Sequence, residues 1–328
     1  MLGMSKVFYI FKDGDLYVKE GTFYFKNVEI SVPIPVEQVL SFELHGGCSV
    51  SSGAFSLAGK HNIPIHIFDY YANYMGTYWP KEHYFSGDLT IKQSLVYSDI
   101  QKRLELARIL VKGVENNMRA FLGHIEGDSA PFLKDNDLND VKSIQDLMLI
   151  EARMRKDYYN RFDAMLPDGF KIDRREIRPP SNYGNSLISF GNTLLYTSII
   201  TAARKTSVNI TIPFYHEPAA GRFALSLDLS EVFKPGIVDR FLYQIVKQGI
   251  LQPNQVHFNE VGGGILLNET GKKIFLEHWD KWLEHTIFHK KLKRKVSHRH
   301  LLVLEMHKYA KHIEGIEKYD PIKIPDGD

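Results

Sequence analysis

Four side chains of the kinds that bind divalent metal ions stand in two segments of the chain. Three of them, His216, Asp228 and Glu231, lie within sixteen residues of one another in FYHEPAAGRFALSLDLSEVF, and the fourth, Glu151, lies upstream in LMLIEARMRKDYYNRF. A set of carboxylates with one imidazole suits a hard ion such as Mg²⁺ or Mn²⁺, whereas zinc favours more histidine or cysteine. We therefore expect metal-dependent chemistry at these residues.

Each of these residues also has an ordinary structural explanation. Asp228 and Glu231 are three apart, so on a helix they share a face and could share one cation. Equally, Asp228 could cap the helix and Glu231 could complete a capping box, and the pair alone favours this cap. A lone loop histidine such as His216 is more often a surface or hydrogen-bonding residue. Glu151 lies among apolar helical positions, and a partly buried carboxylate there needs a partner, which a cation would supply.

Several other catalytic arrangements are absent from the sequence. There is no GxxxxGK[ST] phosphate-binding loop, no GxGxxG after a strand and no GxSxG. The single cysteine, Cys48, lies in a β-rich segment away from any strong base signal, and it excludes both an internal disulfide framework and a CxxC zinc site. Nucleotide hydrolysis and a covalent protein nucleophile are therefore not indicated.

The apolar pattern changes in character about a quarter of the way along the chain. Up to about residue 86, alternating stretches such as KVFYIF, DLYVK and TFYFK are typical of short antiparallel strands. Beyond it, apolar residues recur at spacings of three and four, which predicts helices. We expect an α+β protein of two domains: a small N-terminal antiparallel β domain, residues 1–88, and a larger all-α catalytic domain, residues 89–328. Only 251–268 breaks the helical pattern, and it predicts a small hairpin.

Composition and charge narrow the class of protein. Of 328 residues, 44% are hydrophobic and 24% charged, as in ordinary globular proteins, and no stretch approaches the ~18 apolar residues of a membrane span. We expect a soluble, cytoplasmic protein without membrane contact. The net charge is only +2, yet the run HKKLKRKVSHRH at 289–300 holds six Lys or Arg and no acid. Such a stripe can bind phosphate, although a charge run is more often a solvated helix face.

Three segments resemble a known family. They are IEARMRKDYYNRF, RPPSNYGNSLISFGNTLLY and HEPAAGRFALSLDLSEVFKP, which contains an Asp-Leu-x-Glu step. Together with YSDIQKRLELARILVKG before them and HRHLLVLEMHKYAKHIEG after them, they occur in order and span nearly the whole chain. The chain resembles the CRISPR-associated adaptation nucleases, the endonucleases and integrases that insert new spacers into CRISPR arrays.

The resemblance implies roles for the four candidate residues. It implies that Glu151, His216 and Glu231 bind Mg²⁺ or Mn²⁺ and that Asp228 assists them in catalysis. It also implies that the β domain forms a homodimer, that the helical domain is catalytic, and that a small companion CRISPR adaptation protein joins two dimers. The DNA partners that it implies are a spacer precursor and the CRISPR repeat.

These implications lead to a hypothesis of metal-assisted phosphodiester chemistry, in which a DNA 3′-hydroxyl or water attacks the phosphate. Lys234 and Arg178 are predicted to hold the DNA backbone near the metal. The basic stripe is predicted to contact DNA further out, with binding that weakens as salt rises. Its predicted contact residues are Lys290, Lys291, Lys293 and Arg294.

Two functions of other classes compete with this hypothesis. The first is a non-catalytic DNA-binding dimer whose acidic cluster is structural. The second is a non-haem iron oxygenase, which is disfavoured because that chemistry uses two histidines and one carboxylate, whereas here one histidine accompanies several acids.

Overall fold

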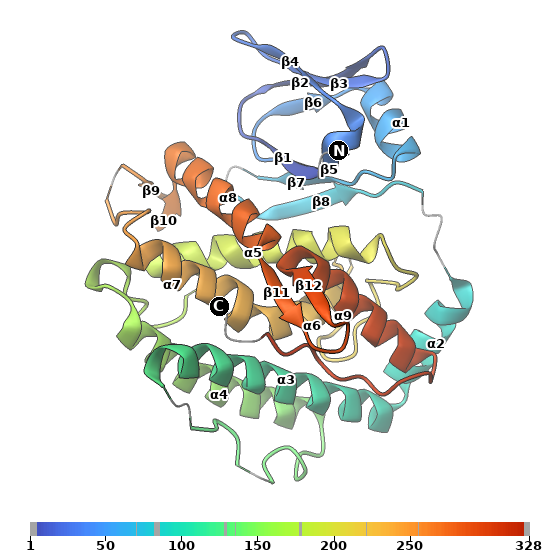
Figure 1. The fold of residues 1–328 in the computed structure, drawn as a ribbon, viewed down its shortest axis with the longest axis vertical. Helices are drawn as coiled ribbons and strands as arrows, with labels where there is room; N and C mark the ends of the chain where they lie inside the picture. Colours follow the sequence, from blue (N-terminus) through green and yellow to red (C-terminus); the bar gives the residue numbers. More distant parts are fainter. Residues whose placement is uncertain are drawn as a thin grey trace. The chain divides into compact units, whose positions relative to one another are not determined.

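A computed structural model describes residues 5–69, 71–81, 86–127, 130–134, 136–176, 179–220, 222–254 and 256–324. The chain divides into two compact units, Met1–Tyr84 and Phe85–Asp328, which are described separately (Figure 1). Unit 1 contains mostly β-sheet and unit 2 is mostly helical. The expected boundary after residue 88 falls inside helix α2 (Gly87–Ser98), because the Ser86 side chain caps that helix by accepting a hydrogen bond from the Leu89 amide at 3.2 Å.

Unit 1 contains two four-stranded sheets, one in the order β4-β3-β2-β6 and the other in the order β1-β5-β7-β8. The expectation of a purely antiparallel domain was wrong, since β1 with β5, β5 with β7, and β2 with β6 pair in parallel. Parallel neighbours need long connections, and here intervening strands and helix α1 provide them. The strands and helix are β1 (Lys6–Ile10), β2 (Gly14–Lys19), β3 (Thr22–Lys26), β4 (Ser31–Ile34), β5 (Val39–Leu44), β6 (Cys48–Val50), α1 (Ser52–Lys60), β7 (Ile65–Phe68) and β8 (Tyr74–Tyr78).

The core of unit 1 consists of the apolar side chains that alternate along these strands. Leu16, Phe23, Phe42 and Ile65 are each fully buried, and the rings of Phe23 and Phe42 meet edge to face with centroids 5.0 Å apart. Ala54 of α1 is buried against the same cluster. The alternation that predicted strands therefore also identifies the side chains that hold the sheets together.

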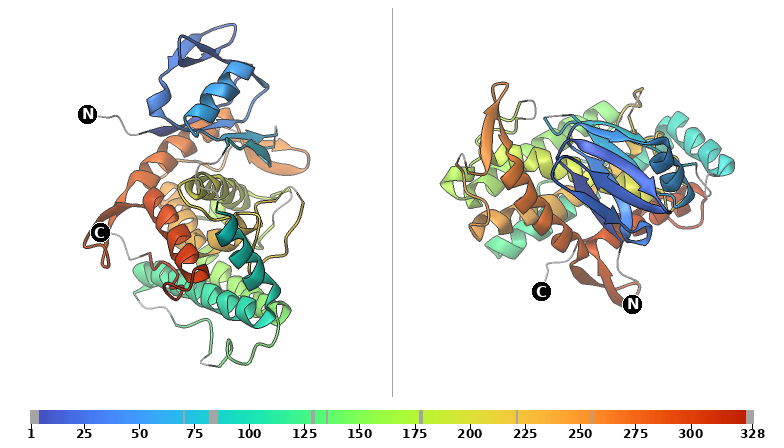
Figure 2. Two further views of the ribbon diagram at one scale, coloured as in Figure 1. Left: turned by 90° about the vertical axis from the view of Figure 1, so that its right-hand side faces the viewer. Right: turned by 90° about the horizontal axis from the view of Figure 1, so that it is seen from above.

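Unit 2 is built from eight helices among its described residues, together with two short hairpins (Figures 1 and 2). The hairpin predicted within 251–268 is confirmed by β9 and β10, but the all-α expectation was wrong because β11 and β12 form a second hairpin. The elements are α2, α3 (Ile100–Glu126), α4 (Ile144–Met165), α5 (Tyr183–Ala203), α6 (Ala224–Phe233), α7 (Arg240–Lys247), β9 (Phe258–Val261), β10 (Gly264–Leu267), α8 (Glu269–Glu284), β11 (Thr286–His289), β12 (Arg294–Ser297) and α9 (His298–Ile313).

The second hairpin, β11–β12, contains most of the basic stripe at 289–300, so this stripe is not the solvated helix face that a charge run more often forms. Thr286 and Ile287 in β11 and Val296 in β12 are β-branched and favour strands. Lys293 in the turn has a φ of 51°, a left-handed conformation that ends any helical path there. The lysines of the turn therefore project from a tight loop.

Helix α5 is the apolar centre of unit 2. By length and composition it could cross a membrane, contrary to the expectation that no stretch could, but 72% of its apolar stretch is buried inside the structure. It packs against α6 and α9, and α3 packs against α4 and α6. Helix α3 thus contacts both helices that hold the candidate acidic residues, α4 and α6.

Candidate metal centre

The four candidate residues come from two helices and one loop of unit 2. Glu151 lies on α4, His216 lies in the loop between α5 and α6, and Asp228 and Glu231 lie on α6. Helix α6 begins at Ala224 and has no side-chain cap, so Asp228 lies inside the helix. The capping-box explanation of the Asp228 and Glu231 pair is therefore wrong.

Asp228 is fully buried and organises the loop that contains His216. Its Oδ2 accepts hydrogen bonds from the amides of Phe214 and Tyr215 at 2.7 and 2.9 Å. Its Oδ1 accepts from the His216 amide at 2.9 Å and bonds His216 Nδ1 at 2.7 Å. These four bonds engage both oxygens of Asp228, so Asp228 positions the loop.

The contact with Asp228 also sets the chemistry of His216. A carboxylate only accepts hydrogen bonds, so Nδ1 is the protonated nitrogen and Nε2 is the one that can ligate a metal. Burial lowers the pKa of His216, but the hydrogen bond and charge of Asp228 outweigh burial and raise it above the usual value. A carboxylate that accepts a hydrogen bond from the other ring nitrogen commonly fixes the orientation of a ligating histidine.

Arg103 of α3 holds the same loop from its other side. Its Nε donates to the Phe214 carbonyl at 3.0 Å, and its Nη2 donates to the carbonyls of Tyr215 and His216 at 3.3 and 3.4 Å. The same nitrogen pairs with Glu217 at 2.7 Å. Arg103 could not be recognised as a site residue from the sequence, because no local pattern connects it with a loop more than a hundred residues away.

Arg155 joins the two glutamates. Its Nε donates to Glu151 Oε1 at 2.6 Å, and its Nη2 donates to Glu231 Oε2. The remaining oxygens are also paired: Tyr215 Oη donates to Glu151 Oε2 at 2.8 Å, and Lys234 Nζ donates to Glu231 Oε1 at 2.6 Å. Arg155 was missed as a site residue, although its position four residues after Glu151 on a helix is a recognisable signal.

The charges of this cluster reinforce one another. Burial raises the pKa of Glu231, but the charges of Arg155 and then Lys234 outweigh it and hold that pKa well below its usual range. Burial likewise opposes the charge of Arg155, and the two glutamates reverse this effect and raise its pKa. Glu231 is therefore an anion at neutral pH, as a metal ligand must be.

The donor set fits a hard divalent ion in kind. Among the described residues, no three His, Cys, Asp or Glu side chains are close enough together to hold an ion as they stand. The guanidinium of Arg155 instead provides the positive charge between Glu151 and Glu231. The Arg155 side chain thus already joins the two carboxylates, and the adjoining loop contains the imidazole of His216, which Asp228 orients.

The predicted DNA contacts have different surroundings. Arg178 lies outside the described residues. Lys234 is paired with Glu231, at the start of the π-helical segment η3 (Lys234–Asp239) that continues α6. Lys290, Lys291, Lys293 and Arg294 all belong to the β11–β12 hairpin.

A buried pair links α4 to η3 behind the cluster. Tyr158 Oη donates to Asp239 Oδ2 at 2.8 Å, while Asp239 Oδ1 has no hydrogen-bond partner among the described residues. Burial raises the pKa of Asp239 to about 6 from the ordinary 3.8, despite that hydrogen bond and the charge of Arg155. This carboxyl group is therefore costly to ionise in the folded protein.

Replacing Asp239 with asparagine should reveal that cost as a pH dependence. A carboxyl group whose folded pKa is raised stabilises the fold at low pH and loses that contribution as pH rises through the folded value. A shift of about two units corresponds to about 3 kcal/mol. We expect the free energy of unfolding of Asp239→Asn, relative to the wild type, to rise by up to about 3 kcal/mol between pH 4 and pH 7.5. Urea titrations at several pH values measure this, and a constant difference would contradict it.

Removing the Tyr215 hydroxyl should weaken metal binding more than folding. Tyr215→Phe leaves Glu151 Oε2 without the group that orients it, and loss of such a partner typically lowers metal affinity 10–100-fold. We expect Mn²⁺ affinity, measured by calorimetry, to fall about tenfold, with a loss of about 1 kcal/mol in stability. Tyr183→Phe removes a hydroxyl elsewhere in unit 2 and is the control. Equal Mn²⁺ affinity in both variants would show that Tyr215 does not orient a ligand.

Comparison with known proteins places this geometry in a family. A family model described as CRISPR associated protein Cas1 matches residues 8–281. The chain is 42% identical to CRISPR-associated protein Cas1 1 of Methanobrevibacter ruminantium over 98% of this chain and 99% of that one. It is 41% identical to CRISPR-associated endonuclease Cas1 of Methanocaldococcus jannaschii over 95% and 97% of the two chains.

Solved structures agree with the sequence comparisons. A Cas1 protein from Thermotoga maritima superposes with a TM-score of 0.86 at 32% identity, covering 96% of this chain and 99% of that one. A casposase bound to integration product has the same fold, with a TM-score of 0.84 at 17% identity over 98% and 93% of the two chains. The resemblance recognised from the motifs is confirmed: this chain belongs to the Cas1 family of CRISPR-associated proteins.

Proposed function

We propose that this chain is a metal-dependent DNA endonuclease and integrase that acquires new spacers and inserts them into CRISPR arrays by phosphodiester cleavage and strand transfer. The names of its full-length relatives support nuclease activity. The observation that carries the proposal is the joining of Glu151 and Glu231 by one cationic group, beside a histidine that Asp228 orients.

Glu151, Glu231 and Nε2 of His216 would hold Mg²⁺ or Mn²⁺. When bound, the ion would polarise the scissile phosphate and stabilise charge on the leaving oxygen. Arg155 must then release at least one carboxylate oxygen, and its guanidinium is well suited to bind phosphate oxygens in its place. Lys234 and Arg178 would hold the DNA backbone nearby, while Asp228 keeps His216 in the ligating tautomer.

The assembly that we propose is a homodimer formed through unit 1, joined by a small companion CRISPR adaptation protein and acting in the cytoplasm. The apolar side chains of Val28, Ile30 and Val32 are exposed in and beside β4, at the end of its sheet, and would suit a second copy of the unit. Structural neighbours of this chain, similar in fold only, include a Cas6-RT-Cas1–Cas2 complex.

Metal titration separates this proposal from a DNA-binding dimer with a structural acidic cluster. We expect the purified protein to bind Mn²⁺ and to cut and join DNA strands only when Mn²⁺ or Mg²⁺ is present. A non-catalytic DNA-binding dimer would bind DNA but would neither bind the metal nor cut or join strands. That result would overturn the proposal. The iron oxygenase is disfavoured further, because the cluster brings together one histidine and several acids.

A further inference from the structure

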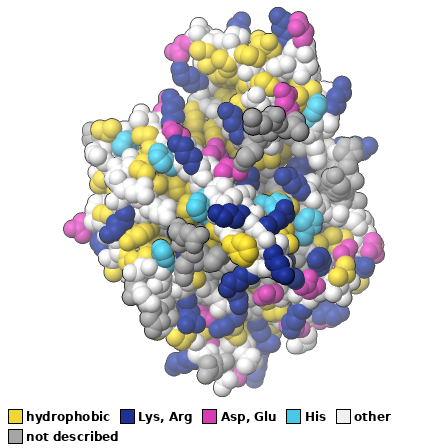
Figure 3. Space-filling view, in the orientation of Figure 1, with side chains coloured by type: hydrophobic (Ala, Val, Ile, Leu, Met, Phe, Trp, Pro, Cys, Tyr) yellow, Lys and Arg dark blue, Asp and Glu magenta, His cyan; other side chains and the backbone are white. Residues whose placement is uncertain are grey.

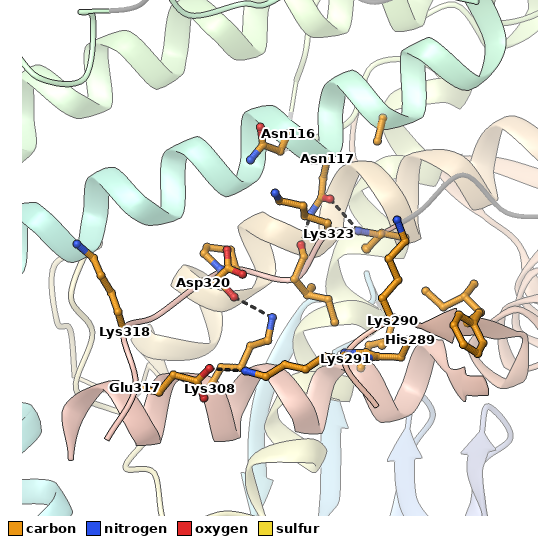
Figure 4. A pocket seen from close by; sticks show the side chains of 17 residues that line it. Asn116, Asn117, His289, Lys290, Lys291, Lys308, Glu317, Lys318, Asp320 and Lys323 are labelled. Carbon is orange, nitrogen blue, oxygen red and sulfur yellow. Dashed lines mark hydrogen bonds and ion pairs between the residues drawn. The ribbon is translucent and has the colours of Figure 1, made fainter. Parts of the chain in front are cut away.

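A pocket of about 480 Å³ lies on unit 2, away from the four candidate residues (Figure 4). Its walls come from α3, from the β11–β12 hairpin, from α9 and from the segment 317–324. The volume is in the range of small-ligand sites. Segments far apart in the sequence thus converge on one cavity.

The pocket carries an excess of positive charge. Five lysines line it against two carboxylates, and Figure 3 shows Lys and Arg side chains gathered over this part of unit 2. Three of the lysines are engaged: Lys291 pairs with Glu317, Lys318 pairs with Glu105, and Lys308 donates to a backbone carbonyl. The two others, Lys290 and Lys323, make no ion pair with any residue in the described part of the chain, and both reach toward the α3 side of the pocket (Figure 4).

The pocket also presents an exposed aromatic ring. Phe288 of β11 lines it with 56% of its surface accessible, and the buried side chains of Leu301 and Ile322 form apolar walls beside it. Lysines alone would suit any anion. Lysines around an exposed ring suit a group that has both a phosphate and a flat apolar face.

The floor of the pocket is tied to the helix of the candidate metal centre. Asn117 of α3 donates to the carbonyl of Val232, the residue after Glu231, at 2.8 Å, and to that of Ile322 at 2.9 Å. Its side-chain oxygen accepts from the Ile324 amide at 3.0 Å. Asn117 therefore connects the pocket to the helix that presents Glu231 by a direct hydrogen bond.

We propose that this pocket binds an unpaired nucleotide of a DNA strand, with its phosphate between Lys290 and Lys323 and its base against Phe288. The inference rests on the proposed function for the identity of the strand. A paired base is not available to enter a pocket, so the ligand is single-stranded. An acidic peptide would satisfy the lysines but would leave the exposed ring without a partner.

Two lysines elsewhere on unit 2 supply a matched control for the test. Lys142 and Lys273 are exposed, carry the same two charges and do not line the pocket. We expect Lys290→Gln with Lys323→Gln to weaken binding of a labelled single-stranded oligonucleotide about tenfold and to flatten its salt dependence, measured by fluorescence anisotropy without divalent metal. Lys142→Gln with Lys273→Gln should change affinity less than about threefold, and Phe288→Ala should weaken binding while preserving the salt slope.

Three results would overturn the inference. They are equal effects of the two double variants, competition by free deoxynucleoside monophosphate as strong as by the unlabelled strand, and loss of affinity for an acidic peptide but not for DNA. The assay contains no divalent metal, so its outcome is separate from the chemistry. A protein inactive with Mn²⁺ that still shows this binding pattern would refute the proposed reaction and retain the pocket.

Discussion

Glu231→Gln is expected to lower Mn²⁺-dependent strand transfer by roughly 1,000-fold or more, equivalent to about 4 kcal/mol of transition-state stabilisation. The substitution removes one anionic ligand of the proposed ion. Glutamine still accepts a hydrogen bond from Arg155, and the partly exposed Lys234 side chain can turn away from the new amide nitrogen. We therefore expect the far-ultraviolet circular dichroism spectrum and DNA binding to be retained. Strand transfer is measured with a labelled DNA end and a repeat-containing target.

Glu277→Gln is the matched control for this experiment. It makes the same chemical change on the exposed face of α8, where Glu277 pairs only with Lys281 among the described residues, and exposed pairs contribute little to stability. We expect its activity to equal that of the wild type. Substantial strand transfer by Glu231→Gln would remove Glu231 from the site.

Asp228→Asn is expected to lower the free energy of unfolding by about 3 kcal/mol and to abolish strand transfer. An amide nitrogen at Oδ1 would face the two N–H donors of His216, and at Oδ2 it would face the amides of Phe214 and Tyr215. In either orientation two buried donors lose their acceptor, at about 1–3 kcal/mol each. Asparagine has nearly the same volume as aspartate, so a cavity does not explain the loss. Urea denaturation measures it.

Asp157→Asn on the exposed side of α4 is the control and should shift stability by less than about 0.5 kcal/mol. Mn²⁺ calorimetry adds a second readout. We expect the Asp228 variant to bind Mn²⁺ more weakly even under conditions where it is fully folded, because His216 is no longer held in the ligating tautomer. A stable variant with normal Mn²⁺ affinity would show that Asp228 does not position the loop.

The periodic helices were the parts of the fold that could be predicted from the sequence. The family motifs identified the candidate site residues. The apolar spacing of three and four predicts the helices beyond residue 86, including α4 around Glu151, because this signal is local. Contacts between residues four apart on one helix are equally local, so the contact between Glu151 and Arg155 could have been predicted from their spacing. Its importance was not recognised, since Arg155 is not a metal ligand.

Contacts between distant segments were not predictable. Alternation in β1 and β5 identifies two strands, but it does not say that they pair in parallel across three intervening strands. The spacing of Asp228 and Glu231 places both on one helix, yet their partners come from a loop and from α4 respectively. Only the folded chain shows that one acid orients the histidine loop while the other meets Arg155.

The π-helical segment between α6 and α7 has a further consequence. An α-helix advances about 100° for each residue, and the wider turns of η3 set the phase between the side of α6 that presents Glu231 and the side of α7 that buries Phe241 and Ile245. Deleting one residue from this segment would rotate α7 about its axis by more than a quarter turn. The length of this segment is therefore constrained more strictly than its composition. A variant that tolerates substitutions here would still not tolerate the insertion or deletion of a residue.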